Sequence, residues 1–277
     1  MKIVGIGGAG CRLADTFAEY PQYTIYKIDD EVEKDKRVYC VPSASSVEEY
    51  EDKCPSFKSF FRSFRKGDEV LCVVSGASKV SAVTLRALSA IQRTNITLLY
   101  IMPEMKLMAH KQKLHERVAF NVFQEYARSG LFKHMYIINN AEVEKIIDNV
   151  PVVGYYDVLN HTIAATKHMI NVWNNNEPVY SSSSETLVTA RVSSFGIVDM
   201  KNNQEKLFFP IDNVNEKCYI YAINKERLET DGKLFAKLKE KIHNGSEMIS
   251  NVKIYSTDYE EDYAYVIVSS SEIQTRE

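Results

Sequence analysis

A glycine-rich turn near the start of the chain separates an apolar segment from a helical pattern. Lys2–Ile6 is short and rich in β-branched residues, and Gly5, Gly7, Gly8 and Gly10 break it into a turn. Glycines let the backbone approach a ligand closely, and the free N–H groups and dipole of a following helix favour negative charge. The order of strand, glycine turn and helix therefore predicts a phosphate site.

The rest of the first half alternates apolar runs with helical patterns. The expected strands after the first are Tyr23–Ile28, Arg37–Val41, Glu69–Val74, Ile96–Ile101 and His134–Ile138. The expected helices after the first are Pro55–Arg65, a helix that follows the turn Ser75–Ser78 and runs through Arg93, His110–Ser129 and Ala141–Asp148, with Glu31–Asp52 mostly loop. Near-continuous apolar strands are typical of a parallel sheet buried on both faces. The alternation predicts a doubly wound α/β domain.

Two of these helices carry an apolar stripe that indicates which face is buried. In the first, Phe57, Phe60, Phe61 and Phe64 recur at helical spacing, and we interpret them as a core-facing aromatic stripe. In the longer one, the apolar face is predicted from the same kind of spacing. Its members are Leu114, Val118, Val122 and Tyr126.

The second half begins with a helix and continues as a strand-rich segment. We expect a helix from Pro151 to about Trp173, then a break at residues 174–176 and 181–184. The later expected elements are the strand Lys217–Ile223, the helix Thr230–His243 and the strands Val252–Ser256 and Tyr263–Ser269. The sequence therefore predicts three parts: an α/β domain over 1–150, a connecting helix over 151–176 and an α+β domain over 177–277.

Composition excludes several classes of protein. A net charge of −3 and the absence of a Lys/Arg block argue against nucleic acid or a membrane surface as partner. No apolar run approaches the ~20 residues of a membrane span, and glycines interrupt any signal-peptide pattern. The five cysteines are scattered without a C-x-x-C pair, so we expect neither a metal site nor disulfides, and a cytoplasmic location.

The glycine turn taken alone also fits a dinucleotide site. Gly5, Gly7 and Gly10 have the spacing of the dinucleotide fingerprint, and Asp29 follows about 20 residues on, where a ribose-binding carboxylate belongs. An NAD- or FAD-dependent oxidoreductase is therefore one hypothesis. The six histidines fall mostly on expected helices without an obvious partner, so nothing downstream indicates dehydrogenase chemistry.

The order of elements resembles that of tubulin and its bacterial relative FtsZ over nearly the whole chain. The segments that carry the resemblance are GIGGAGCR, CVVSGAS, ITLLYIMPE, MYIINNAEVEKII, PVVGYYDVLNHTIAATKHMI, KCYIYAIN, NVKIYS and YAYVIVSS. The resemblance implies a Rossmann-like nucleotide-binding domain, a long central helix and a smaller α+β C-terminal domain. The minimal length resembles a plasmid- or phage-type prokaryotic member more than a cell-division protein.

The resemblance also implies a site for GTP or GDP, with Mg²⁺ accompanying the phosphates. The matching positions are Gly7, Gly8, Ala9, Gly10, Cys11 and Arg12 in the first loop, Gly76, Ser78 and Lys79 in the second, and Asn140, Tyr156 and Asn160 at the base. Arg12 stands where FtsZ has asparagine, and Asn160 where the family has aspartate. The second loop keeps one glycine of a glycine-rich run, and Lys79 could supply charge instead. Tyr156 either stacks on the base or packs in the helix core.

Hydrolysis in this family uses carboxylates of the next subunit, and here the pattern departs. The corresponding loop aligns with Ser182–Leu187, and the two expected aspartates fall on Ser184 and Leu187. Glu185, one position off, is the candidate catalytic residue. Serine does not act unaided as a base near neutral pH. The resemblance therefore implies slow or absent GTP hydrolysis.

Two functions follow from the resemblance, beside the oxidoreductase. The first is a self-associating cytoskeletal protein that forms head-to-tail filaments and binds GTP with weak or lost hydrolysis. The second is a pseudo-GTPase, a structural module that binds an assembly partner and no nucleotide. The acidic stretch Asp258–Asp262 is either a polymer or partner contact or a solvated turn.

Overall fold

The chain forms two compact units. The computed structural model describes residues 1–182, 187–240 and 249–275. Its internal contacts divide the chain into Met1–Ala164 and Ala165–Glu277, here called unit 1 and unit 2. The division falls inside helix α6, Tyr155–Asn174, so the sequence-based division at 150 and 176 stays a prediction. Among the described residues, no helix has the length and apolar character that a membrane crossing requires.

Unit 1 contains a parallel sheet with the strand order β3-β2-β1-β4-β5-β6. The strands are β1 (Lys2–Ile6), β2 (Thr24–Asp29), β3 (Val38–Cys40), β4 (Glu69–Val74), β5 (Asn95–Met102) and β6 (His134–Asn139). The central strands are buried on both faces, which is why they read as continuous apolar runs. The predicted doubly wound α/β architecture is confirmed.

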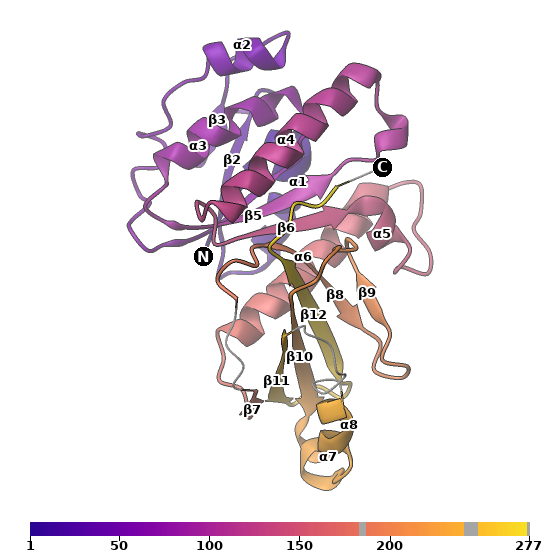
Figure 1. The fold of residues 1–277 in the computed structure, drawn as a ribbon. Helices are drawn as coiled ribbons and strands as arrows, with labels where there is room; N and C mark the ends of the chain where they lie inside the picture. Colours follow the sequence, from indigo (N-terminus) through magenta and orange to yellow (C-terminus); the bar gives the residue numbers. More distant parts are fainter. Residues whose placement is uncertain (183–186, 241–248, 276–277) are drawn as a thin grey trace. The chain divides into compact units, whose positions relative to one another are not determined.

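Helices cover both faces of this sheet. They are α1 (Gly7–Thr16), η1 (Phe17–Glu19), α2 (Val47–Asp52), η2 (Lys79–Val83), α3 (Thr84–Ala90), η3 (Met105–Leu107), α4 (His110–Arg128) and α5 (Asn140–Glu144). α1 packs on β1 and β2, whereas α4 packs on β6. Right-handed connections place α1 on one face and α4 on the other, and Figure 1 shows α4 in front of the sheet.

The helix predicted over Pro55–Arg65 is wrong, because this segment forms successive turns. The amide of Phe61 bonds to Phe57 O, and that of Phe64 to Phe61 O, at 3.0 and 2.9 Å. Turns of three or four residues reproduce the spacing of a helix, so the periodicity was satisfied without one. The core-facing interpretation of the stripe holds, since Phe57 and Phe61 are buried and Tyr26 packs among the rings. The helix α2 lies in a stretch expected to be mostly loop.

The buried face of α4 is also different from the predicted one. The inward residues are Glu116, Phe120, Phe123, Gln124 and Ala127. Leu114 and Val118, predicted to be core residues, are exposed. The sequence pattern favoured the wrong stripe because the buried one includes a carboxylate and an amide. The structure accommodates Glu116 by a hydrogen bond from the Tyr100 hydroxyl at 3.2 Å.

Unit 2 is an α+β unit with a mainly antiparallel sheet. Its strand order is β8-β12-β10-β11-β7, with β9 paired to β8 and β10 parallel to β11. The elements are β7 (Tyr180–Ser181), β8 (Val192–Val198), β9 (Glu205–Leu207), β10 (Glu216–Asn224), α7 (Lys225–Thr230), α8 (Leu234–Glu240), β11 (Ile249–Thr257) and β12 (Tyr263–Ser270). The three predicted strands are confirmed as β10, β11 and β12.

Several predicted boundaries in the chain are corrected. The helix expected up to Arg93 ends at Ala90, and the helix expected over Ala141–Asp148 is α5. The helix expected from Pro151 begins at Tyr155, after Gly154 with φ +75°. The helix expected over Thr230–His243 is divided into α7 and α8 as far as it is described.

Candidate functional site

The strand order of unit 1 has a topological switch point at β1. From β1 the chain proceeds to β2 and β3 on one side, and β4, β5 and β6 follow on the other. In open α/β sheets, ligands bind outside the carboxyl ends of the strands at such a point. The segments that leave β1 and β4 there begin at Gly7 and Ser75. Both loops predicted to hold phosphates therefore start at the switch point.

The first turn of α1 has the properties of an anion site. Gly7 has φ +71°, which favours glycine, and a Cβ there would lie 3.0 Å from Ser78 Oγ. The two loops therefore meet at Gly7 and Ser78. The N-cap, Ile6, offers no side-chain acceptor, and the first turn carries no acidic residue. The opening N–H groups of α1 consequently lack a side-chain partner and, with the helix dipole, favour a bound anion.

The residues of the first loop divide into packing residues and open ones. A Cβ on Gly10 would overlap the carbonyl oxygen of Val73 in β4, so Gly10 serves close helix–sheet packing. The Cys11 thiol points inward, 3.4 Å from Gly5 O, and burial raises its pKa to about 12. Ala9 is exposed. A Cβ on Gly8 would have only ordinary van der Waals contacts, so Gly8 is not required by packing.

Two charged groups border Gly8. The nearest atoms to a Cβ built there are Asp29 Oδ2 at 3.8 Å and Arg12 Nη2 at 3.9 Å. Arg12 is exposed and forms no ion pair within the described part of the chain. Asp29 is buried at the end of β2, and burial raises the pKa of its carboxyl. Arg12 is therefore available to an anion above the first turn.

The second loop forms hydrogen bonds within itself. The Ser78 hydroxyl accepts from the Val80 amide at 3.3 Å, and the Ser78 carbonyl accepts from the Ser81 amide at 3.0 Å. These two N–H groups are therefore unavailable to a phosphate. Val80 is buried, whereas Lys79 is exposed and, among the described residues, has no carboxylate partner.

Core packing explains why residue 76 is glycine. A Cβ at this position would overlap the hydroxyl of Tyr100, the buried β5 residue that donates to Glu116. The glycine that the resemblance assigned to a phosphate contact is required by the core under the loop. This requirement was invisible in the sequence because Tyr100 belongs to the next strand.

The residues predicted to contact the nucleotide base lie directly after β6 and in the first turns of α6. The side-chain Oδ1 of Asn140 is buried without a hydrogen-bond partner in the described structure. The Tyr155 hydroxyl donates to Glu144 Oε2 at 2.9 Å and ties the start of α6 to the end of α5. Tyr156 is 49% exposed, so the alternative of helix-core packing is wrong. Asn160, one turn further along α6, is buried.

The predicted catalytic loop lies in unit 2, and Glu185 and Ser184 fall outside the described residues. The flanks of the loop are anchored: the Ser182 amide donates to Val252 O at 2.9 Å, and the Leu187 amide to Glu216 Oε2 at 3.0 Å. Glu216, a buried carboxylate at the start of β10, was not predicted from the sequence. A charged residue directly before an apolar strand was the available signal.

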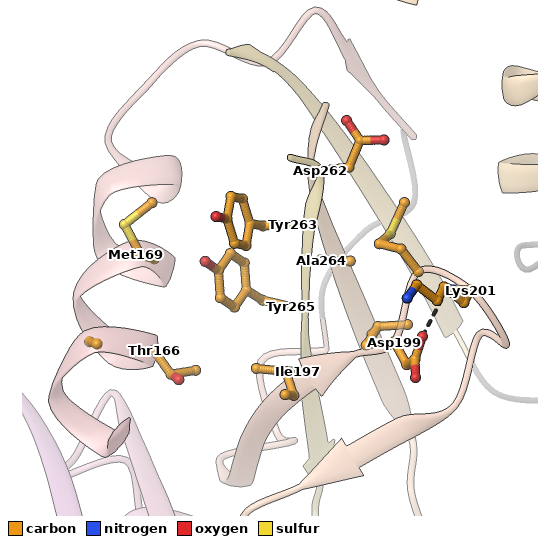
Figure 2. Close-up of a pocket in the computed structure, with 12 residues that line it drawn as sticks. Thr166, Met169, Ile197, Asp199, Lys201, Asp262, Tyr263, Ala264 and Tyr265 are labelled. Atoms are coloured by element: carbon orange, nitrogen blue, oxygen red, sulfur yellow. Dashed lines mark hydrogen bonds between the residues drawn. The ribbon is translucent and has the colours of Figure 1, made fainter. Parts of the chain in front are cut away.

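Unit 2 also contains a cavity of about 340 Å³ between α6 and the strands β8 and β12. In Figure 2, Tyr263 and Tyr265 of β12 lie opposite Met169 and Thr166 of α6. Asp199 accepts a bond from the Lys201 amide at 2.8 Å beside it. The cavity shares no residue with the candidate nucleotide site. Across the described residues, no cluster of three His, Cys, Asp or Glu side chains could hold a metal ion.

The architecture defines a class of protein. A doubly wound sheet, a long helix and an α+β unit together make a fold of the tubulin/FtsZ type. Comparisons with family models and with curated proteins find no match. Comparison with solved structures identifies the fold directly.

Three solved structures illustrate the similarity. Protofilaments of TubZ in the GDP form, from Bacillus thuringiensis serovar israelensis, match with a TM-score of 0.69 at 15% identity, over 97% of this chain and 83% of TubZ. CetZ1 from Haloferax volcanii, a GDP-bound monomer, matches with a TM-score of 0.68 at 16% identity, over 98% and 94%. An empty FtsZ dimer from M. jannaschii matches with 0.63 at 9%, over 97% and 87%. The predicted tubulin/FtsZ-like fold is confirmed.

Proposed function

We propose that this chain binds a guanine nucleotide in unit 1, associates head to tail into filaments and hydrolyses the nucleotide slowly or not at all. The observation that carries the proposal is the uncapped first turn of α1 at the switch point, with Arg12 beside Gly8. Proteins of the same fold are described as protofilaments in GDP and GTPγS forms and as a four-stranded filament.

Each part of the nucleotide has a proposed partner in the described residues. The phosphates lie against the first turn of α1, with Arg12 and Lys79 supplying positive charge. Tyr156 stacks on the base, and the buried oxygen of Asn140 accepts a hydrogen bond from the base. Asn160 presents an amide where the family presents a carboxylate, which weakens selectivity for the guanine edge. Mg²⁺, when bound, would neutralise the phosphates.

The proposal of slow hydrolysis rests on the second loop and on the missing carboxylates. The Val80 and Ser81 amides are bonded within the loop, so phosphate contacts are fewer than in a glycine-rich loop. The positions aligned with catalytic aspartates hold Ser184 and Leu187. Glu185 is the carboxylate from which residual activity would come.

Self-association is supported by an exposed apolar segment near the base end. Val152 and Val153, directly before α6, are 93% and 90% exposed, and Tyr156 follows on the first turn. Single exposed apolar residues are ordinary, but adjacent ones beside a candidate ligand site are typical of interfaces. We therefore place these residues in the head-to-tail contact with the next copy.

The second loop also favours the alternative function, because its amides are bonded within the loop. That alternative is a module with the same fold that binds a partner protein and no nucleotide. The two functions differ in one measurable property, namely nucleotide affinity. An oxidoreductase has no comparable support, because the fold is that of the tubulin/FtsZ superfamily.

Replacing Asn140 by alanine tests the nucleotide directly. The buried, unpartnered Oδ1 destabilises the nucleotide-free protein by about 1–3 kcal/mol. Asn140→Ala therefore leaves the free energy of unfolding unchanged or raises it by about 1 kcal/mol. The same change lowers GTP affinity by about tenfold, because the base loses its acceptor. Urea unfolding and titration calorimetry with GTP, with ATP as competitor, measure the two effects.

The neighbouring Asn139 provides the matched control. Its side chain accepts from the Ala141 amide at 2.9 Å and caps α5. Asn139→Ala is expected to lower the free energy of unfolding by about 1 kcal/mol and to keep GTP affinity. GTP affinity that is undetectable in the unaltered protein, or unaffected by Asn140→Ala, would contradict the proposed site.

A further inference from the structure

The outward face of α4 is an unpartnered apolar stripe. Leu114 and Val118 are 48% and 64% exposed, one helical turn apart. They lie opposite the face that buries Phe120 and Phe123 against the sheet. Figure 1 shows α4 in front of the sheet of unit 1. Since the helix is already anchored by its buried face, the stripe is free to contact another molecule.

Positive charge surrounds this stripe. The basic side chains in the first half of α4 are His110, Lys111, Lys113, His115 and Arg117. Within the described structure, none of them forms an ion pair. Glu48 of α2 is near enough to interact electrostatically with Lys111 and His115. The face therefore suits an occupant that combines carboxylates with apolar groups.

The connection between β11 and β12 has that combination. Asp258, Glu260 and Glu261 are exposed and have no ion-pair partner in the described structure. Tyr259 on this connection and Tyr263, the first residue of β12, are both exposed, with ring centroids 6.0 Å apart and planes at 90°. Acidic charge and aromatic surface are therefore presented together.

This connection is held in a defined shape. The Tyr259 amide donates to Thr257 Oγ1 at 3.1 Å, and Asn224 Nδ2 donates to the Tyr259 carbonyl at 2.7 Å. Asp262 is occupied by an ion pair with Arg227 and by the Asn224 amide. A preorganised loop loses little conformational freedom when it binds.

We propose that the acidic connection Asp258–Tyr263 of one copy docks on the outward face of α4 of a second copy. The carboxylates meet Lys111, Lys113 and Arg117, and the tyrosine rings cover Leu114 and Val118. Charge complementarity orients the contact, and the apolar groups stabilise it. Because two different surfaces are joined, the contact is heterologous and can propagate. It needs no nucleotide and so stands independently of the proposed function.

A charge exchange tests the contact. One variant carries Lys111→Glu and Arg117→Glu, the other Glu260→Lys and Glu261→Lys, and a third carries all four changes. Sedimentation velocity of nucleotide-free protein at low salt gives the self-association constant of each. We expect each two-site variant to weaken association by about tenfold, and the four-site variant to recover to within about threefold of the unaltered chain. Added salt weakens the unaltered contact.

The proposal would be overturned if the four-site variant lost the affinity of both two-site variants combined. It would also be overturned if neither two-site variant changed the self-association constant. Circular dichroism verifies folding, and GTP affinity, measured separately, reports on the nucleotide site. A third outcome is that a single-stranded oligonucleotide binds through α4 and the charge exchange leaves self-association unaffected. That outcome would assign this face to nucleic acid and reject the contact between copies. Weak GTP affinity with intact rescue would leave this contact standing and reject the proposed function.

Discussion

Replacing Gly10 by alanine is expected to lower the free energy of unfolding by about 3 kcal/mol. The added Cβ would overlap the Val73 carbonyl oxygen, a backbone atom of the central strand β4 that has no freedom to withdraw. α1 would have to move away from the sheet that it covers. Alanine gains about 1 kcal/mol of helix propensity over glycine, so the overlap must exceed that gain. The midpoint of urea unfolding measures the net loss.

Gly232→Ala is the control for this substitution. A Cβ there meets nothing within 4 Å, and the backbone is not in the left-handed region. Its free energy of unfolding is expected to change by less than about 0.5 kcal/mol. A Gly10→Ala protein as stable as the Gly232→Ala protein would show that α1 does not pack on β4 as described.

Gly8→Ala is expected to separate binding from stability. A Cβ at Gly8 has contacts of 3.8 Å or more, so the free energy of unfolding should change by less than about 1 kcal/mol. The methyl group would occupy the space where a phosphate approaches the first turn of α1. We therefore expect GTP affinity to fall by about tenfold or more, which corresponds to about 1.4 kcal/mol.

Calorimetric titration of GTP into the Gly8→Ala protein checks this expectation, with Gly232→Ala as the control that retains affinity. Unchanged affinity in Gly8→Ala would mean that the first turn of α1 is not the phosphate site. A large loss in the free energy of unfolding would mean that the surroundings of Gly8 are more crowded than described. The two outcomes are independent, so binding and folding effects are not confused.

Much of the fold was predictable because its strands are buried on both faces. Apolar runs such as Glu69–Val74 have one interpretation in a parallel sheet, and all the strands of unit 1 were placed. β8 was missed because its sequence, VSSFGIV, mixes serine and glycine into the strand. The backbone of β9 passes so close to Gly196 that a side chain there would overlap it. That requirement comes from a partner strand and cannot be seen locally.

The candidate site was predictable in position and less so in detail. The two loops that the sequence singled out for phosphate leave β1 and β4 at the switch point of the sheet, and their role in binding stays a prediction. The sequence did not show that Gly76 is reserved for Tyr100 or that Ser78 closes its own loop. It also left Tyr156 open between core and ligand; its exposure argues against the core, and base stacking stays a prediction. The Gly76–Tyr100 contact joins residues distant in sequence, whereas the Ser78 bonds depend on the local backbone conformation of the loop.

The central claim is that this chain polymerises with GTP and hydrolyses it poorly. Pelleting by ultracentrifugation, with phosphate release followed on the same sample, measures both properties at once. The account predicts that GTP increases pelleting and that pelleting is not accompanied by rapid phosphate release. Rapid release that Glu185→Ala abolishes, or a failure to pellet with GTP at high protein concentration, would contradict it.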